Sequence, residues 1–389
     1  MNGSVTPKGK KWYYVIYLGK INGQKKQKWS SSYNTKREAQ RALRETLHQM
    51  DEGTYIEPTK ETVGSYMVSW LAGRENSVEY NTFKKYRWLT EHHVVPNIGS
   101  IELAKLAPQH LQELYTTLLT KVSPTSKTGK PLSKRSVLHV HNMIHMALDQ
   151  AVNWGMIHRN VSDVVKPPKP TEKEFQRLSS DELRHLLDET RKYRYGVAFF
   201  VTAMTGMRKA EVFGLRWQDV DLSAGVLRVR QTLQYVKGVG PVFKDTKTVN
   251  GRRDVAIDPV TMQQLRNHRK AQLEERLLMG HEYKEHDLVF SRNDGRPASY
   301  STVDKERKKW VERSGVKYIV LHGLRHNHAS DLIEQGESAD VVSKRIGHAR
   351  TSITMDIYVH PRPEQQVKAV NKYAENLFGE QKEQIRKDG

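Results

Sequence analysis

Two arginines in the second half of the sequence are spaced to bind a phosphate. Arg208 follows a glycine-containing break in TGMRKAEVFGLRW, and Glu211 lies three residues further on. Arg325, in LHGLRHNHAS, lies one helical turn after His322, so both side chains can face the same anion. A guanidinium can bind phosphate oxygens with two parallel hydrogen bonds, and a carboxylate can brace it. A surface ion pair between Arg208 and Glu211 is the competing interpretation.

Three further residues could supply proton transfer and a nucleophile. Lys247 lies just before the turn sequence Asn250-Gly251, where its mobile ammonium could protonate a leaving oxygen. His348 and Tyr358 lie ten residues apart in IGHARTSITMDIYVH. Taken singly, a lysine is usually solvated and a tyrosine usually packs against its neighbours, so the evidence lies in the combination.

Metal chemistry is disfavoured by the same residues. His322 and His326 are the helical ligand pair in HGLRHNH, yet no glutamate of the HExxH type and no aspartate cluster accompanies them. The 389-residue chain has no cysteine, which excludes thiolate catalysis and cysteine-bound zinc. We therefore expect no metal and no cofactor, and we interpret His326 and His328 as structural.

The charge balance indicates a polyanionic partner. Lys and Arg number 64 and Asp and Glu 44, a formal net charge of +20 that is spread along the whole chain. No stretch approaches the roughly 18 apolar residues of a membrane span, and the amino terminus lacks the apolar segment of a signal peptide. We expect a soluble, intracellular protein of two or three domains.

Residue patterns divide the chain into three parts. Residues 1–58 read as a β-hairpin with a third strand, then a helix capped by Thr35 and Glu38. Residues 62–165 read as a bundle of four or five helices, with VVPNIGS and SPTSKTGKP as polar connections. The periodic apolar positions of its longest helix are Leu138, His141, Met143, Ile144, Leu148, Ala151, Val152 and Trp154.

The third part, residues 175–389, follows the proline-rich connector VVKPPKPTEKE. It is predicted to be mainly helical, an α+β domain with a small antiparallel sheet. The strands VLRVRQTLQYV and RRDVAID bracket the Asn250-Gly251 turn. Near the carboxy terminus, apolar residues recur at helical spacing and could cover the core of their own domain: Val367, Val370, Ala374 and Leu377.

The ordered set of Arg in TGMRKAE, Lys in TKT, HGLR, GH and YVH resembles the active-site signature of the tyrosine recombinases, the phage integrase family. The resemblance implies two phosphate-clamping arginines, a bracing acidic residue, the lysine of a β-hairpin, two histidines and a tyrosine nucleophile. The two arginines are Arg208 and Arg325, the acidic residue is Glu211 and the lysine is Lys247. The two histidines are His322 and His348, and the nucleophile is Tyr358. Two departures, Gly323 for the usual Asp and Ile346 for the usual Leu, affect only local packing.

The other segments agree with the resemblance. It implies an arm-type DNA-binding domain in 1–58, a helical, SAM-like core-binding domain in 62–165 and the catalytic domain in 175–389. The strand lysines of the arm domain are then candidate DNA contacts: Lys25, Lys26 and Lys28. The apolar carboxy-terminal stretch would dock on a neighbouring protomer.

The implied function is that of an integrase of a temperate phage or an integrative conjugative element. It would cleave and rejoin DNA through a 3′-phosphotyrosine, catalysing integration and excision without ATP or metal. Its partner would be double-stranded DNA with core and arm attachment sites, bound by a homotetramer. An excisionase and a host DNA-bending protein are the accessory partners to expect, and the place of action is the nucleoid in the cytoplasm of a bacterial host.

Three alternatives are distinguishable from this function. A DNA-binding regulator of the same fold would have lost strand cleavage, and the complete residue set including Tyr358 argues against it. An enzyme like a type IB topoisomerase would cleave and reseal one duplex, and the arm-like domain favours integration instead. A metal-dependent nuclease would need a carboxylate cluster that the sequence lacks.

Overall fold

The computed structural model divides the chain into two compact units, Met1–Lys173 and Glu174–Gly389. Among the described residues, no helix combines the length and apolar composition that crossing a membrane requires. The described residues are 3–21, 24–52, 55, 60–124, 126, 129–171, 177–236, 238–246, 251–316, 319–348, 350–358, 367, 370–375, 377 and 378.

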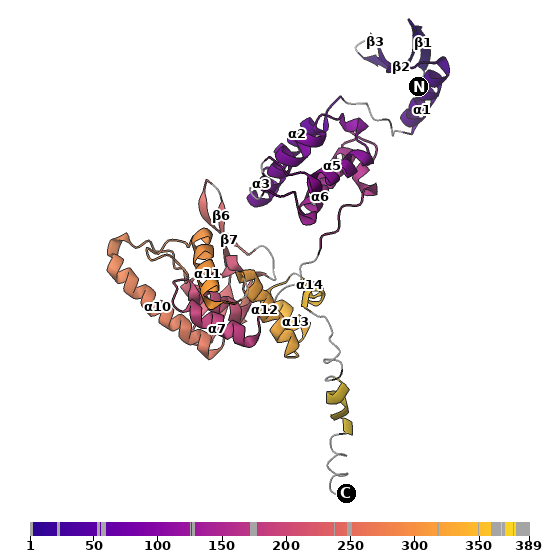
Figure 1. The fold of residues 1–389 in the computed structure, drawn as a ribbon. Coiled ribbons are helices and arrows are strands. Elements are labelled where there is room, and N and C mark those ends of the chain that lie inside the picture. The colour runs from indigo at the N-terminus through magenta and orange to yellow at the C-terminus, as the bar shows by residue number, and fades with distance from the viewer. Residues whose placement is uncertain are drawn as a thin grey trace. The chain divides into compact units, whose positions relative to one another are not determined.

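The first unit begins with a small antiparallel sheet packed on one helix (Figure 1). Its elements are β1 (Gly3–Lys8), β2 (Lys11–Ile21), β3 (Gln24–Trp29) and α1 (Lys36–Asp51). The predicted cap is confirmed, because the Thr35 hydroxyl accepts from the Glu38 amide while the Glu38 carboxylate accepts from the Thr35 amide. Ile16 of β2 and Ala39 and Leu43 of α1 are buried, as a sheet with one helix-covered face requires, and Val15, on the opposite face of β2, is buried as well.

The remainder of the first unit is helical. Its helices are α2 (Val63–Arg74), α3 (Tyr80–Leu89), a π-helical turn (Thr90–Val94), α4 (Val95–Ile98), α5 (Pro108–Thr120), α6 (Lys134–Asn153) and 3₁₀ turns at Leu103–Lys105 and Val161–Val164. The apolar faces of α2, α5 and α6 share one core, and the Tyr66 hydroxyl donates to the Ala147 carbonyl at 2.5 Å.

Two expectations for this helical part are wrong. The stretch VVPNIGS is not a plain connection, because Val95–Ile98 forms α4, which continues directly from the π-helical turn and contains Pro96. Trp154 is 59% exposed rather than part of the α6 core, because α6 ends at Asn153 and the tryptophan lies at its C-cap.

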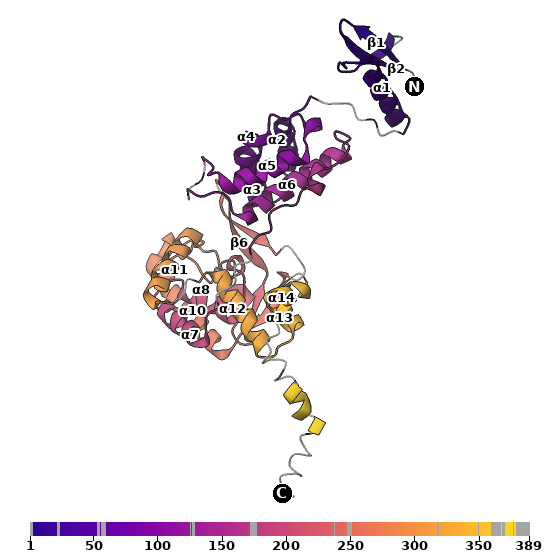
Figure 2. The same ribbon diagram turned by 45° about the vertical axis from the view of Figure 1, so that its right-hand side comes forward.

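The second unit is a helical domain with two small sheets. Its helices are α7 (Ser180–Thr190), α8 (Gly196–Thr205), α9 (Lys209–Val212), α10 (Pro259–Met279), α11 (Tyr300–Ser314), α12 (Leu321–Glu334), α13 (Ala339–Ile346) and α14 (Thr351–Tyr358), with 3₁₀ turns at Trp217–Asp219 and Gly280–Glu282. Figures 1 and 2 both draw α12, α13 and α14 side by side, and these helices contact one another.

The sheets differ from the predicted pair of strands. Their strands are β4 (Val220–Asp221), β5 (Val226–Val229), β6 (Gln231–Val236), β7 (Gly240–Asp245) and β8 (Arg253–Ala256). The predicted pairing of β5 with β8 is confirmed, but β6 instead pairs with the unpredicted β7 in a second sheet. The run 226–236 therefore divides at Arg230, and β6 and β7 form a hairpin that turns near Gly238. Asn250, the first residue of the predicted turn, lies outside the described residues.

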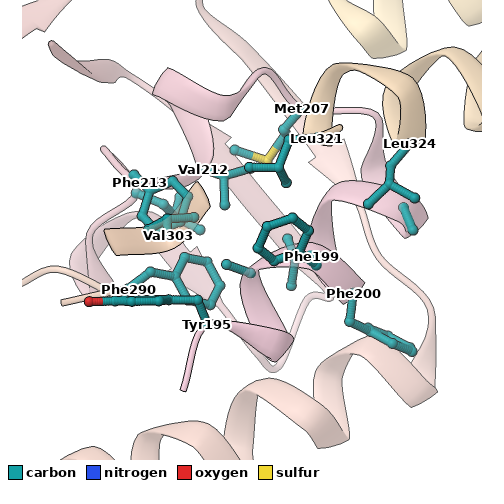
Figure 3. Packing of buried hydrophobic residues seen from close by; sticks show 14 of the residues in the cluster. Tyr195, Phe199, Phe200, Met207, Val212, Phe213, Phe290, Val303, Leu321 and Leu324 are labelled. Carbon is teal, nitrogen blue, oxygen red and sulfur yellow. The ribbon is translucent and has the colours of Figure 1, made fainter. Parts of the chain in front are cut away.

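Helix α8 forms the centre of the second unit's core. Apolar residues lie all round it, as in a helix that is covered on every side. Phe199 meets the ring of Trp310 edge-on at 4.6 Å between centroids, and both side chains are fully buried. Figure 3 shows Phe199 among Met207, Val212 and Leu321, which come from three other parts of the domain.

Replacing Phe199 with alanine should destabilise this unit strongly. The lost transfer energy and the cavity beside Trp310 should lower the free energy of unfolding by about 3–5 kcal/mol, as measured by denaturant unfolding followed by near-UV circular dichroism. Leu277, which is 82% exposed on α10, is the control, and Leu277→Ala should change the stability by less than about 0.5 kcal/mol. Equal losses in both variants would contradict this account of the core.

Candidate active site

Two helices of the catalytic unit end at glycines whose backbone is left-handed. Gly206 follows α8 with φ of 66°, and Gly347 follows α13 with φ of 72°. A Cβ at Gly206 would lie 2.8 Å from the His328 ring and 2.9 Å from the Ile346 side chain, so only glycine fits here. The carboxyl ends of α8 and α13 therefore approach each other closely.

Arginines bind the backbone carbonyls at this junction. Nη1 of Arg325 donates to the carbonyls of Gly206 at 2.7 Å and Ile346 at 2.6 Å. Nη2 of Arg208 donates to the Gly347 carbonyl at 2.5 Å. Helix carboxyl ends carry partial negative charge, so they stabilise the two guanidinium groups. Arg325 is buried, whereas the Arg208 side chain is 40% exposed and faces solvent.

Glu211 braces Arg208 from inside the domain. Its Oε1 accepts from Nη1 of Arg208 at 2.7 Å, and its Oε2 accepts from the Arg208 amide at 2.8 Å. The side chain of Glu211 is only 3% exposed, which rules out the surface ion pair considered above. Arg208 is also the N-cap residue of α9, so the short helix and the ion pair position each other.

Arg253 of β8 is a partner of Glu211 that sequence reasoning missed. Its Nη2 donates to Oε2 of Glu211 at 2.8 Å and its Nη1 to Oε1 at 3.2 Å, in a bidentate pair. Burial would raise the pKa of Glu211, but hydrogen bonds from Arg253, its charge and that of Arg208 hold the pKa below its ordinary value. The motif RRDVAID predicts a strand and gives no sign of this contact, which spans 42 residues.

The two predicted histidines lie within the field of these arginines. Burial, then Arg325 and Arg208, lowers the pKa of His348 to about 4, and the same three causes lower the pKa of His322. Both rings are therefore neutral at pH 7 in the free protein. The structure thus brings together Arg208, Glu211, His322, Arg325 and His348.

Each ring of the cluster has a neighbour that orients it. Nδ1 of His348 hydrogen-bonds to the buried Thr354 hydroxyl at 2.9 Å, and the His322 ring meets His326 edge-on at 4.4 Å. Nε2 of His328 accepts from Nε of Arg345 at 3.0 Å beneath Gly206, which confirms a structural role for His328. Sequence reasoning missed Thr354 and Arg345, because a hydroxyl and an arginine on short helices carry no distinctive pattern.

The structure describes Lys247 and Tyr358 less fully. Lys247 lies outside the described residues, which end at Thr246 after β7 and resume at Gly251 before β8. Tyr358 is the last residue of α14, a helix that packs against α12 and α13. Helix α12 carries His322, and α13 ends shortly before His348. Both helices contact the helix that carries Tyr358.

The candidate DNA-binding lysines belong to β3 of the amino-terminal sheet. The backbones of Lys25 and Lys26 lie within this strand. Lys28 is paired with the buried Ile16 in the sheet register, and its ammonium lies 5.5 Å from the Tyr55 ring centroid. Directly paired residues lie on the same face of a sheet, so Lys28 lies on the face that carries the buried Ile16.

The carboxy-terminal apolar residues are exposed. Val367, Val370 and Leu377 are 59%, 65% and 55% exposed, so the interpretation in which they cover their own core is wrong for these three. By contrast, Ile346, which departs from the pattern that the sequence resembles, is fully buried with Ala329 and Val342. Gly323 is likewise buried within α12.

Comparison with known proteins gives the class of protein first. Residues 4–50 match an arm DNA-binding domain, residues 62–119 the N-terminal SAM-like domain of phage integrases, and residues 176–365 the phage integrase family. This order of domains, with the cationic cluster in the last, defines a DNA-binding recombination enzyme. The chain belongs to the phage integrase family: it is a tyrosine recombinase, an enzyme of site-specific DNA recombination.

Individual proteins resemble the chain over most of its length. A tyrosine recombinase XerC-like protein of Caldanaerobacter subterraneus subsp. tengcongensis is 28% identical over 93% of this chain and 95% of its own. The fold is similar to the Tn1549 transposon integrase in complex with transposon right end DNA, with a TM-score of 0.68, 18% identity and coverage of 80% of this chain and 99% of that one. A lambda integrase tetramer bound to a Holliday junction gives a TM-score of 0.54 at 15% identity, over 90% and 94% of the two chains.

The histidines of this site should make the catalytic unit sensitive to mild acid. His326, His328 and His348 each have a pKa lowered to about 4, so between pH 6.5 and 4 the unfolded chain binds protons that the folded chain does not. Stability should therefore fall as the pH falls through this window. Carboxylates with lowered pKa values, such as Glu211, lose their contribution only at lower pH.

Calorimetric unfolding of the full chain at pH 7, 6 and 5 measures this dependence. His328→Gln keeps an acceptor for Arg345 but does not titrate, so its melting temperature should fall less between pH 7 and pH 5 than that of the wild type. An identical fall in both proteins would show that the pKa of His328 is not depressed.

Proposed function

We propose that this recombinase cleaves and rejoins DNA through a 3′-phosphotyrosine on Tyr358, without a metal or other cofactor, to integrate and excise a phage or other mobile element. The observation that carries the proposal is the gathering of two arginines and two neutral histidines at the ends of α8 and α13. Helix α14, which ends at Tyr358, packs beside them.

The arginines and His348 bind the scissile phosphate. Attack by a nucleophile adds negative charge to the non-bridging oxygens, and cationic donors already in place stabilise that charge without reorganising. Arg208, with its exposed side chain, contacts the phosphate, and Arg325 contributes from the buried side. Thr354 orients the His348 ring through its Nδ1, and His348 serves as an additional hydrogen-bond donor to the phosphate.

Two proton transfers complete the cleavage step. Neutral His322 accepts the phenol proton of Tyr358 as the phenolic oxygen forms a bond to phosphorus. Lys247 gives a proton to the departing deoxyribose 5′-oxygen as the P–O bond breaks. The products are a 3′-phosphotyrosine and a free 5′-hydroxyl. Attack by a 5′-hydroxyl of another duplex reverses the step, so no ATP is consumed.

The assembly that performs strand exchange is a homotetramer on DNA in the bacterial nucleoid, with the arm domain on arm sites and the helical and catalytic domains on core sites. The lambda integrase tetramer on a Holliday junction supports this arrangement by similarity of fold. The exposed apolar residues Val367, Val370 and Leu377 dock on the neighbouring protomer. An excisionase and a host DNA-bending protein assist the recombinase where the direction of the reaction, integration or excision, is controlled.

Tyr358→Phe should bind DNA with unchanged affinity and form no covalent complex, because phenylalanine lacks the nucleophilic oxygen. The assay incubates the full chain with a nicked duplex spanning the element's own end, in chelator, and follows denaturant-resistant protein–DNA adducts on gels. The wild type should form an adduct at the 3′ end. Cut ends without an adduct that require magnesium would support a nuclease, and bound but intact DNA would support a regulator.

Lys247→Ala should slow cleavage by about 10²–10⁴-fold, the usual contribution of a general acid. A substrate with a 5′-bridging sulfur should restore the rate, because a thiolate leaves without needing a proton. The ratio of single-turnover rates on the sulfur and oxygen substrates measures this restoration. Should the variant cleave the sulfur substrate as slowly as the oxygen substrate, Lys247 is not the proton donor.

A further inference from the structure

The last turn of α13 presents three successive backbone carbonyls to three different arginines. The pairs are Arg345 O with Nε of Arg253 at 2.7 Å, Ile346 O with Nη1 of Arg325 at 2.6 Å, and Gly347 O with Nη2 of Arg208 at 2.5 Å. His348 follows this turn directly. The path of the backbone into His348 therefore depends on all three guanidinium groups.

Arg253 differs from the other two because it also binds a carboxylate. Its Nη atoms hold both oxygens of Glu211, and its Nε holds the end of α13. Its side chain is 7% exposed, which leaves it little contact with solvent. It therefore links β8 to α9 and α13, the elements that position Arg208 and His348.

We propose that Arg253 is a positioning residue for strand cleavage, which orients Arg208 through Glu211 and His348 through the end of α13. The inference rests on the proposed function, since it assigns Arg208 and His348 to the phosphate. Arg253 itself does not touch the DNA in this proposal.

The geometry requires an arginine at this position. A planar guanidinium can direct its Nη atoms at a carboxylate and its Nε at a carbonyl at the same time, whereas a lysine ammonium is a single point charge. Gly347 leaves the space that the guanidinium needs, because a Cβ there would lie 2.7 Å from Nη1 of Arg253. Its φ of 72° independently favours glycine.

Removing Arg253 would change the charge state of its partner. The charged groups around Glu211 are Arg208 from its own turn and Arg253 from β8, with the backbone of Arg345 completing the contact from α13. Without Arg253, a buried carboxylate keeps one cationic partner, so it takes up a proton at a higher pH. A protonated Glu211 binds Arg208 less firmly, and Arg208 leaves its productive orientation.

The experiment compares Arg253→Gln and Arg253→Lys with the control Arg228→Gln. Arg228 lies on β5 of the same sheet and its side chain pairs with Asp221, so its substitution removes the same charge elsewhere. All variants are full-length, and near-UV circular dichroism verifies their fold. The substrate is the nicked duplex spanning the element's end.

Arg253→Gln should cleave about 10²-fold more slowly than the wild type in single turnover at pH 7. Its affinity for DNA should stay within about threefold of that of the wild type. Arg253→Lys should recover little of the loss, and Arg228→Gln should cleave normally. Relative to wild type at the same pH, the rate for Arg253→Gln should fall further from pH 8 to pH 5, and this additional fall should vanish in the double variant with Glu211→Gln, in which position 211 cannot titrate. Wild-type cleavage by Arg253→Gln, or a loss independent of pH, would overturn the proposal.

A readout without DNA separates this inference from the proposed function. The carboxyl pKa of Glu211, followed by ¹³C NMR, should rise in Arg253→Gln and stay unchanged in Arg228→Gln. An unchanged pKa in Arg253→Gln would refute the positioning role whatever the wild type does with DNA. A raised pKa together with no adduct from the wild type would instead count against the phosphotyrosine mechanism alone.

Discussion

Hydrogen bonds between arginine guanidinium groups and the carbonyl ends of α8 and α13 hold the candidate active site of this recombinase together. Arg325 bridges the two helix ends, and Arg208 binds the residue that follows α13. Two cations brought close together repel each other, and burial adds a desolvation cost. The partial negative charge of two helix termini and the carboxylate of Glu211 offset both effects, so the cations are in place before any phosphate arrives.

This arrangement also sets the protonation of the histidines. The arginines and burial keep His322 and His348 neutral in the free protein, the state needed to accept a proton or to present one N–H to an oxygen. A bound phosphate adds negative charge and favours their protonation. In the mechanism that we propose, the same cationic cluster binds the phosphate and favours protonation of its histidines as negative charge develops during cleavage.

Close packing at the helix ends explains why small residues occur there. Gly206 and Gly347 allow the chain to turn sharply and allow a ring or a guanidinium to lie against the backbone. The apolar helix α8 anchors one of these ends in the domain core, through Phe199 and Trp310. The site is therefore positioned by the core of the domain, and α14, the helix that ends at Tyr358, packs against α12 and α13 beside it.

The sequence by itself determined the features that depend on neighbouring residues: the Thr35 cap, the helical periodicities, the β5 and β8 strands, and the ordered motif that marks the family. It placed Arg208, Glu211, His322, Arg325 and His348 in one site because that motif keeps their order. Only the tertiary structure decided that β6 pairs with β7, that Trp154 is exposed and that Arg253 binds Glu211. Strand pairing and contacts across 42 residues depend on how distant segments pack, and local patterns carry no record of that packing.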